Sequence, residues 1–169
     1  MSIGNCVRIG WLVGVLVGGA ALADETPGTA EVLGKMHHLN LQEIEKGKMA
    51  QDHGLSKELK SLGKMLVKDH AAADKRVVKL AKGEKLDLAA HTPPRDIKAD
   101  QIHTGAAFDD AFAQEMLDDH KKDIAELTAA RDATTDAKLK QLLTDLLPVL
   151  KKHQDAAQKL VDQSSKHGT

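Results

Sequence analysis

Apolar residues recur every three or four positions along two long segments of this chain. In one segment the recurring positions are Leu55, Leu59, Leu62, Leu66, Ala73, Val77 and Leu80. In the other they are Leu139, Leu142, Leu146, Leu150, Ala157 and Leu160. A spacing of about 3.6 residues puts such side chains on one face of an α-helix and leaves a charged face opposite. Each apolar face has to be buried against another, so the pattern predicts helices that pack side by side in a bundle.

Start and stop signals divide the chain into four helices. They are expected at about residues 29–53, 56–82, 105–131 and 136–163. Ser56 is a suitable N-cap residue, and Gly54 and Gly83 follow the first and second segments. The stretch from Gly83 to His103 contains Pro93 and Pro94, which cannot continue a helix, so it is expected to be a long connection. We therefore predict an all-α four-helix bundle, formed as one domain by residues 24–169.

The composition agrees with this fold class and excludes others. Aromatic residues make up 2% of the chain, which is too few for the strands of a β-sandwich or for stacking on nucleic-acid bases. Lys and Arg total 24 against 25 Asp and Glu, so the net charge is −1. A nucleic-acid-binding protein needs a basic field, and we therefore expect no nucleic-acid partner.

The first 23 residues resemble a secretory signal peptide. Arg8 ends a short positive region, an apolar run covers residues 9–17, and small residues at 20–23 precede the first acidic pair. The apolar run is short for a transmembrane helix, and an uncleaved membrane anchor is the alternative interpretation. We expect a periplasmic mature protein over residues 24–169, without stable membrane insertion after cleavage.

Polar side chains interrupt the apolar stripe near the middle of each helix. Burial of such groups without partners is unfavourable by several kcal/mol, so they are expected to satisfy one another. Imidazoles and carboxylates from facing helices would do so by binding a divalent metal ion: zinc, copper or iron. The alternative is a layer of groups that only hydrogen-bond to one another. The predicted metal-site residues are His70, His120, His153, Glu43, Asp69 and Asp119.

The second and third helices form a weak internal repeat at an offset of 50 residues. Leu66–His70 matches Met116–His120, and both histidines lie about 14 residues into their helices. They are level if these helices run parallel. A connection of about 20 residues reaches about 66 Å, more than the roughly 42 Å of one helix. This predicts a ferritin-like bundle with a long crossover between the second and third helices, with up-down-up-down as the alternative.

The level of His153 is harder to place. Counted from the turn before the last helix, it lies about six residues, or ~9 Å, from the level of His120 and closer to Glu43. Either the site is elongated, or His153 belongs to a second tier with Met65 and Met116, which would favour copper. Pro148 lies one turn before His153 and is expected to bend the last helix, either to follow the core or to aim the histidine.

Five segments resemble a family of secreted bacterial helical proteins, the domain-of-unknown-function family forty-one forty-two. The segments are Glu43–Gly47, Met65–His70, Gly105–Asp109, Met116–His120 and Leu147–His153, and the resemblance covers about residues 30–162. It implies a ferritin-like fold and a periplasmic or outer-membrane location, and it implies no established activity. Ferritin-like di-iron proteins carry Glu-x-x-His pairs, whereas this chain has adjacent Asp-His pairs.

These observations lead to competing functional hypotheses. The first is a periplasmic metal-binding bundle of unknown activity. The second is a metal-free structural or stress-related protein of the cell envelope, in which the polar layer fixes the helix register. A redox enzyme is the weakest interpretation, because the di-carboxylate pattern and an aromatic relay are missing from the sequence. No catalytic residue is predicted.

Overall fold

Five helices make up the part of the chain that the structure, a computed structural model, describes: residues 27–91 and 105–167. They are α1 (Thr29–His53), α2 (Lys57–Gly83), α3 (Leu88–His91), α4 (Ala106–Ala133) and α5 (Ala137–His167). No strand occurs in these two ranges, which confirms the all-α prediction. The long helices correspond to the four predicted ones, but α4 and α5 end two and four residues later than expected. The signal peptide predicted at 1–23 lies outside the described residues.

The predicted connection between the second and third long helices contains a short helix of its own. The four-residue α3 follows α2 closely, inside the connection predicted from Gly83 to His103. Leu86 and Leu88 pack against the apolar core there, which explains why this segment folds back onto the bundle. Pro93 and Pro94 lie outside the described residues.

Side-chain caps account for the starts of two helices. The Ser56 hydroxyl accepts a hydrogen bond from the backbone N–H of Leu59 at 3.2 Å, which confirms the predicted N-cap of α2. Asp136 plays the same part for α5, because its carboxylate accepts from the N–H groups of Lys138 and Leu139 at 2.8 and 3.0 Å. A cap of this kind stabilises a helix by ~1 kcal/mol.

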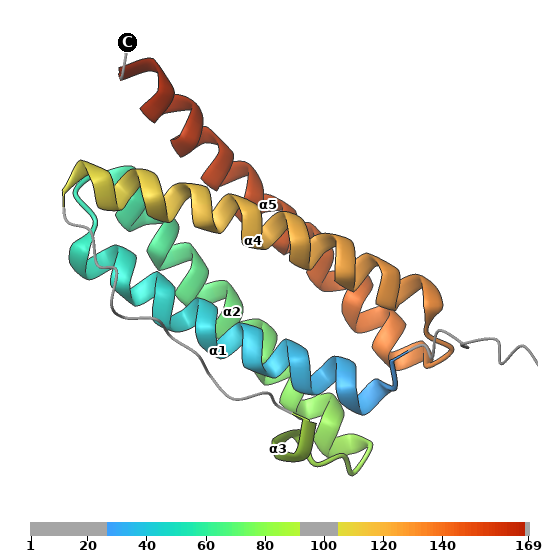
Figure 1. The fold of residues 1–169 in the computed structure, drawn as a ribbon. Helices are drawn as coiled ribbons and strands as arrows, with labels where there is room; N and C mark the ends of the chain where they lie inside the picture. Colours follow the sequence, from blue (N-terminus) through green and yellow to red (C-terminus); the bar gives the residue numbers. More distant parts are fainter. Residues whose placement is uncertain (1–26, 92–104, 168–169) are drawn as a thin grey trace, which may run out of the picture.

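Contacts between helix ends set the directions of the helices. Asp109, in the first turn of α4, accepts hydrogen bonds from the N–H groups of Leu55 and Ser56, which precede α2, at 2.8 Å each. At the other end of the bundle, Lys138 near the start of α5 pairs with Glu84, which follows α2, at 2.6 Å. Thus α2 and α4 run parallel, and α1 and α5 run against them (Figure 1). The predicted parallel pair is confirmed, and the up-down-up-down alternative is wrong.

Two apolar clusters fill the interior on either side of a polar layer. One includes Val77, Leu127 and Leu143, and the other includes Leu59 and Phe112. The buried polar side chains of the bundle are His38, Asn40, Glu43, His70, His120 and His153. The interruptions of the sequence stripes therefore correspond to polar groups buried at mid-length.

The helices α1 and α2 approach closely at two facing glycines. A Cβ atom added at Gly47 would lie 2.8 Å from the carbonyl oxygen of Gly63, and one added at Gly63 would lie 2.5 Å from that of Gly47. Side chains do not tolerate such distances, so this crossing requires glycine at both positions. Asn40 and His70 lie seven residues, about two turns, from the crossing along the two helices. The glycines therefore set the spacing of α1 and α2 near the polar layer.

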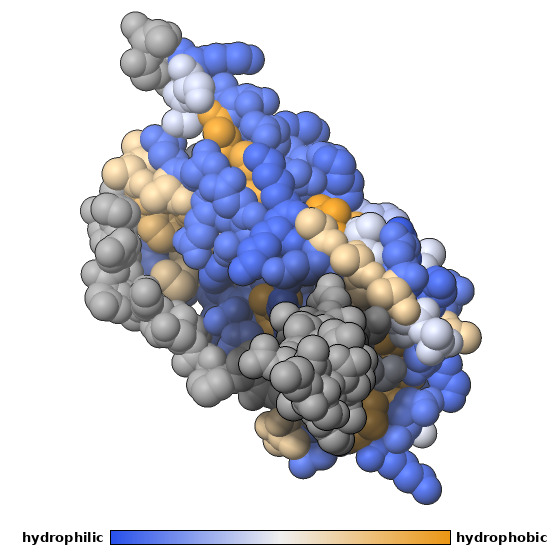
Figure 2. Space-filling model, turned by 45° about the vertical axis from the view of Figure 1, so that its right-hand side comes forward, coloured by the Kyte–Doolittle hydropathy of each residue, from blue (hydrophilic) through white to orange (hydrophobic). Residues whose placement is uncertain are grey.

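The outer faces of the helices are hydrophilic. Figure 2 shows one side of the molecule, where hydrophilic side chains cover most of the coloured surface. On the outer faces, ion pairs such as Arg76 with Asp145, 2.6 Å apart, connect neighbouring helices. In the described ranges, no helix has the length and apolar character needed to cross a membrane.

Candidate metal centre

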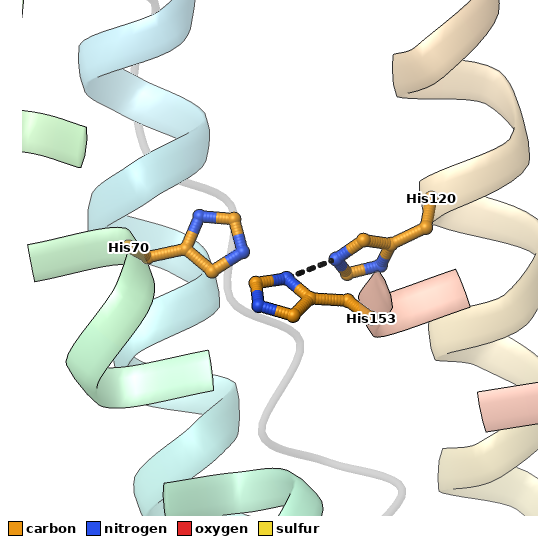
Figure 3. Close-up of side chains that lie close together, drawn as sticks. All are labelled: His70, His120 and His153. Atoms are coloured by element: carbon orange, nitrogen blue, oxygen red, sulfur yellow. Dashed lines mark hydrogen bonds between the residues drawn. The ribbon is translucent and has the colours of Figure 1, made fainter. Parts of the chain in front are cut away.

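Three buried histidines from three different helices meet in the middle of the bundle. His70 comes from α2, His120 from α4 and His153 from α5, and their exposed fractions are 4%, 1% and 1%. Each continues the apolar stripe of its helix, so packing of the stripes turns all three rings inward. Figure 3 shows the rings facing one another in the space between the helices.

The three imidazoles are close enough to share one metal ion. One ring nitrogen from each lies within 4.8 Å of the other two. The distance between His120 Nε2 and His153 Nδ1 is 3.2 Å, and the ring centroids of His70 and His120 are 5.8 Å apart. The approach of His70 to His120, expected from the 50-residue repeat, is therefore present, and His153 completes the group.

The outer nitrogen of each ring is held by an oxygen acceptor. The pairs are His70 Nδ1–H to Asn40 Oδ1 at 2.9 Å, His120 Nδ1–H to the Met116 carbonyl oxygen at 2.9 Å, and His153 Nε2–H to Asp69 Oδ2 at 3.2 Å. A neutral imidazole has one N–H and one lone pair. These outer bonds therefore leave lone pairs on the three nitrogens that face one another.

Hydrogen bonds among the rings cannot satisfy these inner nitrogens. With the tautomers just described, His120 Nε2 and His153 Nδ1 are both acceptors, and a hydrogen bond between them requires a second proton on one of the two rings. Even in that state, the buried His70 Nε2 has no hydrogen-bond partner. A buried polar atom without a partner is costly, by ~1–3 kcal/mol. One cation between the rings would accept all three lone pairs.

Burial keeps the cluster neutral and therefore able to bind a metal. Burial, together with the charge of neighbouring His153, lowers the pKa of His120 to about 4. Burial and the two neighbouring imidazoles hold the pKa of His70 well below its ordinary value. Burial also lowers the pKa of His153, although Asp69 acts in the opposite direction. Neutral imidazole is the metal-binding form, so no proton has to leave these rings at pH 7.

The nitrogen spacing is close to that of a tetrahedral site. Zinc–imidazole bonds of about 2.0–2.1 Å place two ligand nitrogens about 3.3 Å apart. The 3.2 Å between His120 and His153 already matches this distance. The remaining separations, at most 4.8 Å, need the His70 ring to move inward by about 1.5 Å or less. Three protein ligands leave a fourth coordination position for an exogenous ligand.

The carboxylates predicted for the site take other positions. Asp69 lies behind the cluster, as the acceptor for the outer nitrogen of His153. Asp119 turns to Lys46, whose Nζ donates to its carboxylate at 2.6 Å, and Glu43 lies 3.5 Å from the same Nζ. Burial raises the pKa of Glu43 to about 7 against the opposing effect of Lys46. Neither Glu43 nor Asp119 belongs to the histidine group.

The placement of His153 corrects the expected level. His120 lies 13 residues before the last residue of α4, and His153 lies 16 residues after the first residue of α5. The difference is three residues, about 4.5 Å, instead of six. The cause is that α4 ends two residues later, at Ala133, and α5 begins one residue later, at Ala137, than the sequence suggested. Side chains of histidine length bridge the remaining offset.

The methionines considered for a second tier are parts of the core. Met116 is fully buried in the cluster with Phe112, and Met65 packs against that cluster. Met116 contributes its backbone carbonyl to His120. Both side chains therefore serve as parts of the apolar core and do not form a second tier with His153.

Sequence reasoning assigned no role to Asn40, which orients His70. Asn40 interrupts the stripe of the first helix, and it is 6% exposed. A buried amide on the apolar face of a helix needs a partner. From this requirement the sequence could have predicted that Asn40 pairs with a histidine on the neighbouring helix.

Comparison with known proteins gives one match. A family model described as "Domain of unknown function (DUF4142)" matches residues 18–160, which is most of the chain. Neither the curated proteins nor the solved structures contain a significant match.

Proposed function

Because the chain belongs to the DUF4142 family, whose function is unknown, we propose from its site that it is a periplasmic helical bundle that binds one divalent metal ion. The ligands are His70, His120 and His153. Asn40, the Met116 carbonyl and Asp69 hold the three rings from behind.

The convergence of three lone pairs on one point is the observation that supports this proposal. Histidines that bind metals donate their other N–H to a carboxylate, a carbonyl or water, which fixes the tautomer and the ring orientation. All three histidines have such an oxygen partner. A metal-free network of hydrogen bonds would satisfy these atoms less completely, because His70 Nε2 would have no partner.

The donor set narrows the chemistry of the ion. Neutral imidazoles suit zinc, copper and iron, whereas calcium and magnesium prefer oxygen ligands. The site has no thiolate ligand, and it therefore differs from the structural zinc sites that are rich in cysteine. With three protein ligands, a bound ion would be able to act as a Lewis acid.

Metal uptake by purified protein tests the proposal. The mature chain, made without a histidine tag, is stripped with a chelator, incubated with zinc and desalted, and the metal is measured by mass spectrometry. We expect about one zinc ion per chain. His70→Ala should lose one of three ligands and bind at least about tenfold more weakly.

His37→Ala is the matched control. This histidine lies on α1 and pairs with Asp74 at 2.6 Å, outside the cluster. It should bind zinc like the wild type. Equal uptake by the wild type and the His70 variant would show that the cluster is not the site. Absence of uptake by the wild type would favour the metal-free alternative.

The periplasmic location is tested separately, because it depends on residues 1–23. Fractionation of cells that express the full chain should release it with the periplasmic contents, shortened by the signal peptide. Deletion of residues 2–23 should retain the protein in the cytoplasm. A full-length chain in the membrane fraction would favour the uncleaved anchor instead.

A further inference from the structure

A small cavity adjoins the histidine cluster. Its lining includes two of the three rings, His70 and His153, and two of the residues that hold them, Asn40 and Asp69. Three of the four long helices that line it also provide the ligands. The fourth, α1, provides no ligand and forms a wall with Met36 and Leu39. The cavity therefore adjoins the cluster at His70 and His153.

The walls of the cavity are mainly apolar. Ala73, Leu127 and Leu146 lie among the lining residues. A water molecule enclosed in a protein needs two to four polar partners. Most of the residues that line the cavity are apolar, so it is better suited to a molecule that makes few hydrogen bonds.

Size and charge restrict the ligand further. The cavity has a volume of about 30 Å³, about twice the minimum for one enclosed water. Lysine and arginine do not occur among its described lining residues, whereas the carboxyl groups of Asp69 and Asp123 do. An anion would meet no positive side chain there, and an uncharged molecule would meet no penalty.

We propose that the cavity admits a small uncharged molecule of two or three heavy atoms, of the class of nitric oxide and dioxygen, to the open position of the metal. This inference rests on the proposed metal site. Leu39 of α1 and Val149 of α5, which both line the cavity, are half-buried.

Nitric oxide on the Fe(II)-loaded protein is the probe. Fe(II) uptake is measured first under anaerobic conditions, and nitric oxide binding is then followed by visible absorption and electron paramagnetic resonance. We expect one nitric oxide per iron. Ala73→Val adds two methyl groups to the cavity and should weaken nitric oxide binding at least tenfold, with iron uptake unchanged.

Ala81→Val is the matched control, because Ala81 is buried on the same face of α2 but does not line the cavity. It should bind nitric oxide like the wild type. Leu127→Ala provides a second, independent test by enlarging the cavity. It should bind tert-butyl isocyanide to Fe(II), whereas the wild type should exclude this bulkier molecule.

The outcomes separate the two proposals. Failure of the wild type to take up any metal overturns the metal site and this inference with it. Metal uptake without nitric oxide binding overturns only the inference. Equal nitric oxide binding by the wild type and the Ala73 variant also overturns it, because the ligand would then reach the metal by another route.

Discussion

Asp69 connects the buried histidine cluster with the surface of the bundle. Its side chain is 19% exposed and accepts the Nε2–H of His153, whose side chain is 1% exposed. A carboxylate behind a metal-binding histidine raises the basicity of the ring and holds its orientation. Asp69 is therefore the residue at which a change outside the ligand set should have the largest effect on the metal.

Asp69→Asn keeps the shape of this acceptor and removes its charge. We expect the zinc dissociation constant to rise by about 10- to 100-fold, the usual effect of changing such a partner. Competition with a chromophoric chelator measures it. Asp74→Asn is the control on the same helix, because Asp74 pairs with His37 outside the cluster. If both variants bound zinc equally weakly, the loss of affinity would come from the change in net charge and not from the lost interaction between Asp69 and His153.

The pKa of His120 makes the stability of the metal-free protein depend on pH. Burial lowers this pKa to about 4 from an ordinary value of 6.5. Between pH 6.5 and 4 the unfolded chain binds more protons at this residue than the folded one. The free energy of unfolding should therefore fall on acidification through this window, by up to about 3 kcal/mol from His120 alone.

Denaturant unfolding of His120→Leu against the wild type isolates this contribution. The variant should lose less stability than the wild type between pH 7 and 4.5. The comparison is needed because Glu43, with its pKa raised to about 7, contributes with the opposite sign between pH 7 and 4.5. Parallel losses in the two proteins would contradict the assignment of the pH dependence to His120.

At the scale of the helices, the α1–α2 pair depends on the glycine crossing. Gly63→Ala would normally favour a helix by about 1 kcal/mol. Here the added methyl group would meet Gly47 O at 2.5 Å and the Cβ of Ala50 at 2.9 Å. We expect a net loss of about 1–3 kcal/mol, as for other overpacked sites, measured by thermal or denaturant unfolding.

Gly83→Ala is the control for this prediction. It lies at the end of the same helix, and a Cβ atom there would have no neighbour within 4 Å. It should leave the stability unchanged or raise it slightly. If Gly63→Ala were also neutral, the two helices would be free to separate at the crossing. The distance between α1 and α2 near Asn40 and His70 would then not depend on the two glycines.

The helices themselves were predictable, because apolar residues recur at helical spacing along them and start and stop signals mark most of their ends. Most of the predicted stripe positions, such as Leu66 and Leu142, are buried, whereas Leu55 lies before α2 and is 68% exposed. The end of α4 was less accessible to prediction. Asp132 favours a turn, but the helix continues past it to Ala133, and ends of helices vary by one or two residues. That small shift, together with the start of α5 one residue later than expected, changed the level of His153.

The site was predictable only in part, because a stripe indicates which side chains point inward and not what they meet. The 50-residue repeat placed His70 and His120 together because it preserves the phase of both stripes. The prediction did not consider Lys46. This residue lies one turn after Glu43 and attracts both Glu43 and Asp119 by charge. Competition for carboxylates between a lysine and a metal cannot be read from periodicity.

At the scale of the whole molecule, the polar layer separates two apolar clusters and joins three helices. His70, His120 and His153 come from α2, α4 and α5, and Asn40 adds α1 through its hydrogen bond to His70. Each apolar cluster holds one half of the bundle together. A metal ion at the layer would connect all of the long helices between these halves, directly or through Asn40. Binding should therefore stabilise the entire fold instead of one segment.

The thermal stability of the mature protein tests this expectation. An ion that binds the folded chain adds about 2.7 kcal/mol to the free energy of unfolding at 100 times its dissociation constant. For a chain of this size that corresponds to a rise in Tm on the order of 10 °C. Zinc should produce one cooperative transition at the higher temperature in the wild type and in His37→Ala. His70→Ala/His120→Ala should show no rise, because only His153 of the three ligands remains. A similar rise in the double variant would mean that the stabilising ion binds elsewhere. If zinc did not raise the Tm of the wild type, the polar layer would serve only to fix the register of the helices.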